Sequence, residues 1–164
     1  MLNGMKLVGA IMMASQSNAA LPNFSFMEHR ANTAYNFQSL VDAGCEDSPE
    51  GITCSREDTV AGQWAYIDYL IVDQKLSRLN VVGFRDALPD LIPALESKYG
   101  TPCRQTTRTV ANRAGGRFES AEFTWCFSTG ELTLSERANR LDSYQLTYRD
   151  HRTLPRKRSV TPDF

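Results

Sequence analysis

The chain of 164 residues has the length of one ordinary domain, and its 41% hydrophobic and 23% charged residues are typical of a globular protein. A net charge of −1 argues against a generally basic surface for nucleic acid. The apolar run at residues 7–14 is far shorter than the roughly 20 residues of a membrane-spanning helix. Composition therefore predicts one folded domain, with no nucleic-acid partner and no stable membrane insertion.

The first twenty residues resemble an export signal. Lys6 precedes the apolar run, and a polar segment then ends in small residues. Both Ser17-Asn18-Ala19 and Asn18-Ala19-Ala20 fit the small-x-small rule for cleavage. We therefore expect a signal peptide at residues 1–20 and a mature chain that starts near Ala20 or Leu21. An ordinary N-terminal helix in a cytosolic protein is the alternative.

The cysteine count supports export. Cys45, Cys54, Cys103 and Cys126 are even in number and follow the expected signal, as in disulfide-bonded exported proteins. They lack the C-x2-C spacing and the nearby histidines of structural zinc sites, so no metal site is expected. Three pairings are open, and the simplest joins sequence neighbours, Cys45 with Cys54 and Cys103 with Cys126. A periplasmic or secreted location follows.

The first part of the folded chain predicts a strand, a helix and a loop. Residues 24–29 predict a short strand. Residues 31–44 have apolar side chains at helical spacing, with Asn32 or Thr33 at the start and Gly44 at the end. The acidic segment at 46–51 predicts a turn-rich loop. The side chains expected on the buried side of this helix are Ala34, Phe37, Leu40 and Val41.

Residues 63–72 give the strongest strand prediction. Both of its faces are largely apolar, which predicts a central strand, and residues 76–84 predict its hairpin partner. The alternation places Ala65, Ile67, Tyr69 and Ile71 on one face and Trp64, Tyr66, Asp68, Leu70 and Val72 on the other.

A second helix is expected at 91–99. Proline is tolerated only where a helix amide would be unpaired, so Asp90 is expected to cap the helix and Pro93 to occupy its third position. Gly100 supplies the left-handed residue after the helix, and Pro102 prevents its resumption.

The rest of the chain predicts three or four strands. Residues 104–116 predict a strand and a loop, and strands are expected within 117–127, 131–137 and 143–149. We therefore predict a single α+β domain at 21–149, with two helices packed on an antiparallel β-sheet, and a flexible basic tail at 150–164. Each half runs helix, glycine, cysteine, strands, so two related halves remain an open alternative.

The second half of the chain carries a resemblance. Lys98 to Pro102 give a K-Y-G-x-P pattern, Asn112 to Phe118 give N-x-x-G-x-x-F, and Trp125 follows. Over residues 84–149 the chain resembles a recurrent type of small exported bacterial protein of uncharacterised function. The layout of helix, sheet and one disulfide in each half is also similar to the beta-lactamase inhibitor protein fold. No inhibitory residue can be carried over, because no local motif matches.

Catalytic motifs are missing from the sequence. It has no Gly-rich phosphate loop and no G-x-S-x-G elbow, and His29 and His151 are its only histidines. No catalytic residue, metal or cofactor is therefore predicted. The aromatic strand gives the candidate binding residues, with core packing as the alternative reading. These candidates are Trp64, Tyr66, Asp68 and Tyr69.

Charge is unevenly distributed along the chain. Residues 41–73 carry eight acidic side chains and one basic one, whereas residues 98–158 carry twelve basic and six acidic ones. Either the two halves attract one another, or they are solvated faces that happen to differ in charge, or a charged surface meets a partner. We expect an exported, non-enzymatic binding or inhibitory module whose partner is an envelope or extracellular protein. The alternatives are a small hydrolase that uses Asp68 or Glu122 and a cytosolic, phage-related accessory protein with reduced thiols.

Overall fold

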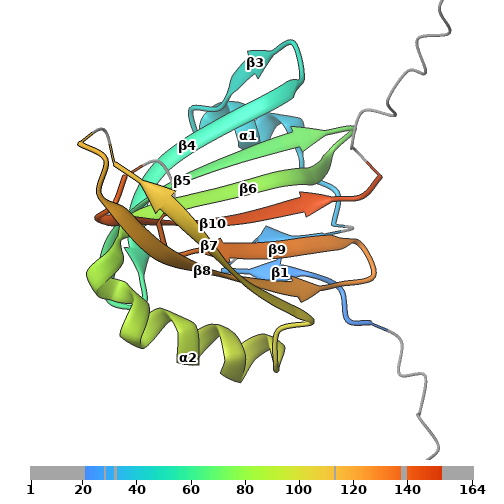
Figure 1. Cartoon of the computed structure of the whole chain (residues 1–164). Coiled ribbons are helices and arrows are strands. Elements are labelled where there is room, and N and C mark those ends of the chain that lie inside the picture. Colours follow the sequence, from blue (N-terminus) through green and yellow to red (C-terminus); the bar gives the residue numbers. More distant parts are fainter. Residues whose placement is uncertain (1–20, 28, 32, 113, 138–139, 153–164) are drawn as a thin grey trace, which may run out of the picture.

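The structure is a computed structural model that describes residues 21–152 except 28, 32, 113, 138 and 139 (Figure 1). The expected signal peptide lies outside the described residues, as does most of the expected basic tail. Asp150, the first residue assigned to the tail, is the last residue of a strand and is buried.

The described chain forms an eight-stranded antiparallel sheet, a two-stranded hairpin and two helices, one of them small. This agrees with the predicted α+β class, although strands predominate. The hairpin consists of β1 (Ser25–Phe26) and β2 (His29–Arg30). The helices are α1 (Phe37–Asp42) and α2 (Leu88–Tyr99), which follows a 3-10 turn at Arg85–Ala87. The sheet contains β3 (Glu46–Ser48), β4 (Gly51–Val60), β5 (Gln63–Val72), β6 (Lys75–Phe84), β7 (Arg104–Ala111), β8 (Arg117–Cys126), β9 (Gly130–Ser135) and β10 (Ser143–Asp150).

The sheet has a symmetric strand order, β3-β4-β5-β6-β10-β9-β8-β7. Each half of the chain forms a four-stranded meander, and the last strands of the two meanders, β6 and β10, pair at the centre. One short helix precedes the first meander, and α2 precedes the second.

One face of the sheet carries the hydrophobic core. Residues that pair across neighbouring strands point to the same face, so the register defines rows of side chains that cross the sheet. One row joins Tyr69, Leu79, Tyr148, Leu132 and Trp125. All five are buried, and α2 packs on this side through Leu88, Leu91 and Leu95 (Figure 1).

The first helix is shorter than predicted. It begins after Asn36, whose side chain accepts hydrogen bonds from the amides of Gln38 and Ser39 at 2.8 and 3.4 Å. The prediction of a start at Asn32 or Thr33 was therefore wrong, because the preceding chain is tied to the sheet by a bond from the Tyr35 amide to the Gln74 carbonyl. The expected burial also fails for two residues, since Val41 is 47% exposed and Ala34, which precedes the helix, is exposed as well.

The second helix starts earlier than predicted. The 3-10 turn and Pro89 begin it ahead of Asp90, and Pro93 lies inside it. The fixed backbone angle of Pro89 suits a first turn, which explains the early start. The predicted end is confirmed, because Gly100 has a φ of 80° and its amide bonds the Glu96 carbonyl at 2.8 Å.

The segment predicted as an acidic loop contains a strand. Glu46–Ser48 forms β3, whose residue Glu46 pairs with Thr53 of β4. The turn chemistry of residues 49 and 50 was recognised, but the short strand before it was not. Three residues are too few to show an alternation in sequence.

Both predicted disulfides are formed. Cys45 bonds Cys54 and Cys103 bonds Cys126, and no described cysteine is free. The second disulfide lies beyond the end of α2, on the side of the sheet away from the helix, because Cys126 pairs with the outward-facing Glu131. Gly100 is on the helix side, where its carbonyl accepts a bond from the Trp125 indole at 2.8 Å. The chain therefore passes around the edge of the sheet between Gly100 and Cys103. Formed disulfides indicate an oxidising, extracytoplasmic environment.

Tyr144 lies at the centre of the core with a hydroxyl that has no hydrogen-bond partner among the described residues. Burial raises its pKa to about 12. The ring packs on Gly83, where an added Cβ would lie 2.6 Å from it, so this position requires glycine. Tyr148, which lies two inward-facing rows further along β10, is also buried but donates a bond to Thr129 Oγ1 at 2.8 Å.

This difference predicts opposite effects of the same substitution. Tyr144→Phe should raise the free energy of unfolding by about 1 kcal/mol, because it removes a buried hydroxyl that is not hydrogen-bonded. Tyr148→Phe should lower it by about 1 kcal/mol, because Thr129 loses its partner. Urea unfolding of both variants tests this, and a loss of stability in Tyr144→Phe would show that its hydroxyl has a partner.

Candidate functional site

The second face of the sheet carries polar and aromatic side chains, and neither helix packs on it (Figure 1). One row of outward-facing side chains crosses the sheet from β4 to β7 and lies between buried rows that face the other side. Its members are Glu57, Tyr66, Val82, Gln145, Ser135, Glu122 and Thr106. This row connects the two features that could bind a partner, which are a polar groove over the second meander and an aromatic patch over the first.

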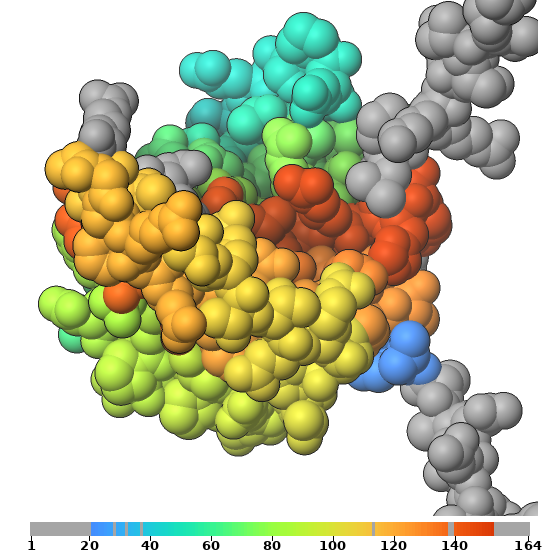
Figure 2. Space-filling view, in the orientation of Figure 1, coloured from blue at the N-terminus to red at the C-terminus, as the bar shows by residue number. Residues whose placement is uncertain are grey.

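The groove encloses about 370 Å³ above β8, β9 and β10. Arg108 of β7 lines it together with Arg149 of β10, although β8 and β9 lie between these strands. The sheet must therefore curl so that β7 approaches β10, and Figure 2 shows the hollow between the yellow-orange surface of this edge and the red surface of β10.

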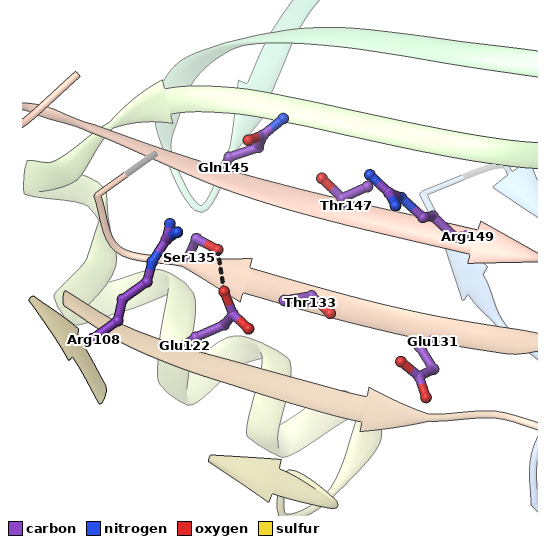
Figure 3. Close-up of a pocket in the computed structure, with 8 residues that line it drawn as sticks. All are labelled: Arg108, Glu122, Glu131, Thr133, Ser135, Gln145, Thr147 and Arg149. Atoms are coloured by element: carbon purple, nitrogen blue, oxygen red, sulfur yellow. Dashed lines mark hydrogen bonds between the residues drawn. The ribbon is translucent and has the colours of Figure 1, made fainter. Parts of the chain in front are cut away.

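Hydrogen bonds organise much of the groove (Figure 3). Glu122 Oε2 accepts a bond from the Ser135 hydroxyl at 3.1 Å. Beside it, Gln145 donates to Asn80 Oδ1 at 2.6 Å. At the other end Glu131 pairs with Arg104 at 3.2 Å. These bonds fix the orientation of the polar side chains before a ligand binds.

Two arginines remain available in the groove. The guanidinium of Arg108 donates to the Arg137 carbonyl at 3.3 Å, which uses one of its five N–H groups. Arg149 lines the groove and is exposed, and its side chain forms no ion pair or hydrogen bond with the described residues. The groove can therefore bind carboxylates or carbonyl groups through arginine, and amide or cationic groups through Glu122.

The aromatic patch consists of Trp64, Tyr66 and Phe84. These side chains are 48%, 38% and 54% exposed, and the rings of Trp64 and Phe84 lie 6.0 Å apart. Tyr66 belongs to the row that leads to the groove, two strands away from Gln145 and so about 10 Å from it. Large exposed aromatic side chains on an uncovered sheet are typical of a binding surface.

The predicted binding residues do not all lie together. Trp64, Tyr66 and Asp68 share the open face, where Asp68 accepts a bond from the Ser55 hydroxyl at 2.6 Å. Tyr69 lies on the opposite face and is buried, with its ring 4.2 Å from that of His29. The alternation of the strand already separated Tyr69 from the others, and the structure has the same arrangement.

The two carboxylates of the hydrolase alternative are far apart. Asp68 lies on β5 and Glu122 on β8. These strands are four strand spacings apart, which is about 19 Å across the sheet. Within the groove, Glu131 of β9 lies opposite Cys126 of β8, four residues along the strand from Glu122. This separates the backbone positions of the two glutamates by about 13 Å. Paired glycosidase carboxyl groups lie about 5–9.5 Å apart. This geometry gives the hydrolase alternative no support.

Most residues of the groove were not predicted from the sequence. Arg108, Gln145 and Arg149 were not candidates, because strand order brings β10 beside β9 and the curl of the sheet brings Arg108 to the same groove. A partial signal existed, since residues 143–149 alternate strictly and predict a strand with one wet face.

The described part of the chain contains no cluster of three or more side chains able to hold a metal ion. No helix within it is long and apolar enough to cross a bilayer. The chain matches no known family model, no curated protein and no solved structure.

Proposed function

We propose that this protein is an exported, non-enzymatic binding or inhibitory module whose open sheet face takes an envelope or extracellular protein as its partner. The exposure of Trp64, Tyr66 and Phe84 on that face is the observation that carries the proposal. A single exposed apolar residue needs no explanation, but three neighbouring aromatic rings on an uncovered sheet are a costly surface for a protein that binds nothing.

The shape and charge of the face support a macromolecular partner. The row from Glu57 to Thr106 runs through both the patch and the groove, so one ligand can contact both. Acidic groups, Glu57 and Asp68, lie near the patch, whereas the available arginines, Arg108 and Arg149, line the groove. Acids without arginine partners near the patch and available arginines in the groove would favour one orientation of a partner.

The proposed location rests on the cysteines and on the expected signal. Two disulfides form within a chain that has ample length for a core, which fits an oxidising compartment. In the proposed arrangement two related halves, each held by one disulfide, contribute the patch and the groove respectively. Rigid positioning of both lowers the entropy cost of binding.

Loss of the patch should abolish capture of the partner. The wild-type chain, immobilised and exposed to envelope extract of the native host, is expected to retain a defined protein that the double variant Trp64→Ser/Phe84→Ser does not retain. Hot-spot aromatic residues contribute about 2 kcal/mol or more each, so at least a hundredfold loss of affinity is expected.

Val41→Ser is the matched control, because Val41 is also exposed and apolar but lies on α1. The control variant should retain the same protein as the wild type. If the double variant retains the protein as well as the control does, the open face is not the binding surface. If the wild type retains nothing that either variant affects, the proposed function is wrong.

A further inference from the structure

The patch has an unusual charge environment. Glu57 lies directly across from Tyr66 on the neighbouring strand, and Asp68 follows Tyr66 on the same face. Trp64 flanks Tyr66 on its other side. The three aromatic rings are thus bordered by two carboxylates, and we call these five residues the acid–aromatic patch: Glu57, Trp64, Tyr66, Asp68 and Phe84.

Neither carboxylate is neutralised within the part of the chain that the structure describes. Glu57 Oε2 accepts only from the Trp64 indole at 3.4 Å, and Asp68 Oδ1 accepts only from Ser55 Oγ at 2.6 Å. Both donors are uncharged. Arg78, the arginine of β6 on the same face, is paired with Glu50 at 3.4 Å instead. The patch therefore has a charge of −2 and one carboxylate oxygen free on each acid.

This combination is chemically specific. The face of an aromatic ring is negative and attracts cations, and a nearby carboxylate strengthens the attraction. An anionic ligand would be repelled by both. A purely apolar ligand would cover the rings but leave the two carboxylates without a partner, which is unfavourable when water is excluded.

We infer that the partner places an arginine side chain on the acid–aromatic patch. The inference rests on the proposed function and specifies the chemistry of its partner. The planar guanidinium can stack on Trp64 or Tyr66 and at the same time donate two parallel hydrogen bonds to Glu57 or Asp68. A lysine ammonium is more strongly hydrated and cannot stack in this way, so it binds more weakly at an exposed site.

The two tryptophans of the chain allow a direct test. Trp64 lies in the patch, whereas Trp125 is 2% exposed and donates its indole hydrogen to Gly100. In a ¹H–¹⁵N spectrum of the full chain, the Trp64 indole reports on the patch and the Trp125 indole is an internal control. The probes are four capped peptides of sequence Gly-Ser-Gly-X-Gly-Ser-Gly, in which X is arginine, lysine, norleucine or glutamate.

The arginine peptide is expected to shift the Trp64 indole signal in a saturable way, without moving that of Trp125. The lysine peptide should bind about threefold more weakly, and the norleucine and glutamate peptides should not saturate. Glu57→Gln and Asp68→Asn should each weaken arginine binding about threefold or more. Glu96→Gln, which removes the same charge from α2, should not change it.

The outcomes separate this inference from the proposed function. Equal binding of the arginine and glutamate peptides, or unchanged binding in both acid variants, would overturn the arginine assignment. The arginine assignment would also be overturned if no peptide shifts the Trp64 indole signal although the Trp64→Ser/Phe84→Ser variant fails to retain the captured protein. In that case the open face binds its partner through other chemistry. Saturable arginine binding by a chain that captures no protein would instead contradict the proposed function.

Discussion

Replacing Trp125 with alanine is expected to lower the free energy of unfolding by about 3–5 kcal/mol. The indole is 2% exposed, lies in the buried row of the sheet and stacks near Phe123 with ring centroids 6.4 Å apart. Its Nε1 also donates to the Gly100 carbonyl at 2.8 Å, which ties the end of α2 to β8. The substitution removes packing and this bond together, so α2 loses its attachment at one end.

The other tryptophan provides the control. Trp64→Ala removes a side chain of the same size from the open face, where it is 48% exposed, and should change the free energy of unfolding by no more than about 0.5 kcal/mol. Urea unfolding followed by circular dichroism measures both variants. Similar losses of stability in the two variants would mean that the open face is covered and is not available as a binding surface.

Removal of either disulfide is expected to be the next largest effect. A disulfide restricts the unfolded chain more strongly when it closes a longer loop. The sequence separations are 23 for Cys103–Cys126 and 9 for Cys45–Cys54. The loop-entropy relation gives losses of about 3.4 kcal/mol for the double variant Cys103→Ala/Cys126→Ala and about 2.6 kcal/mol for Cys45→Ala/Cys54→Ala.

Urea unfolding of the two double variants, each in oxidised buffer, tests this order. Because each variant keeps the other disulfide intact, they control for one another. Reduced wild-type protein should be less stable than either. A greater loss for Cys45→Ala/Cys54→Ala would show that packing of Cys54, which is buried in the core, outweighs loop length.

The elements that the sequence predicted well are those determined by residues close together in the chain. Residues 63–72 match β5 from end to end, because a largely apolar run of strand-forming residues is bounded by turns on both sides. Gly100 ends α2 as expected, since its positive φ is a local requirement. Helix starts were predicted less well: the bond from the Tyr35 amide to Gln74 and the turn at Arg85–Ala87 depend on contacts or geometry that the residue pattern does not reveal.

The candidate site was only partly predictable for a related reason. Trp64, Tyr66 and Asp68 fall on one face by alternation alone. That this face lacks a helix, and that Arg108 reaches the same groove as Arg149, follow from strand order and sheet curl. Sequence periodicity specifies which side chains share a face of one strand, but not which strands become neighbours.

The symmetric strand order has a consequence for how the chain folds. Every pairing in the sheet joins strands adjacent in sequence, except the central one between β6 and β10. The six local pairings can form as hairpins, which close in microseconds. Neither disulfide crosses the central pairing, so oxidation leaves it unconstrained. Within the sheet, the slow part of the search is therefore the docking of two preformed meanders, and the loop-closure entropy of pairing distant strands arises at that step.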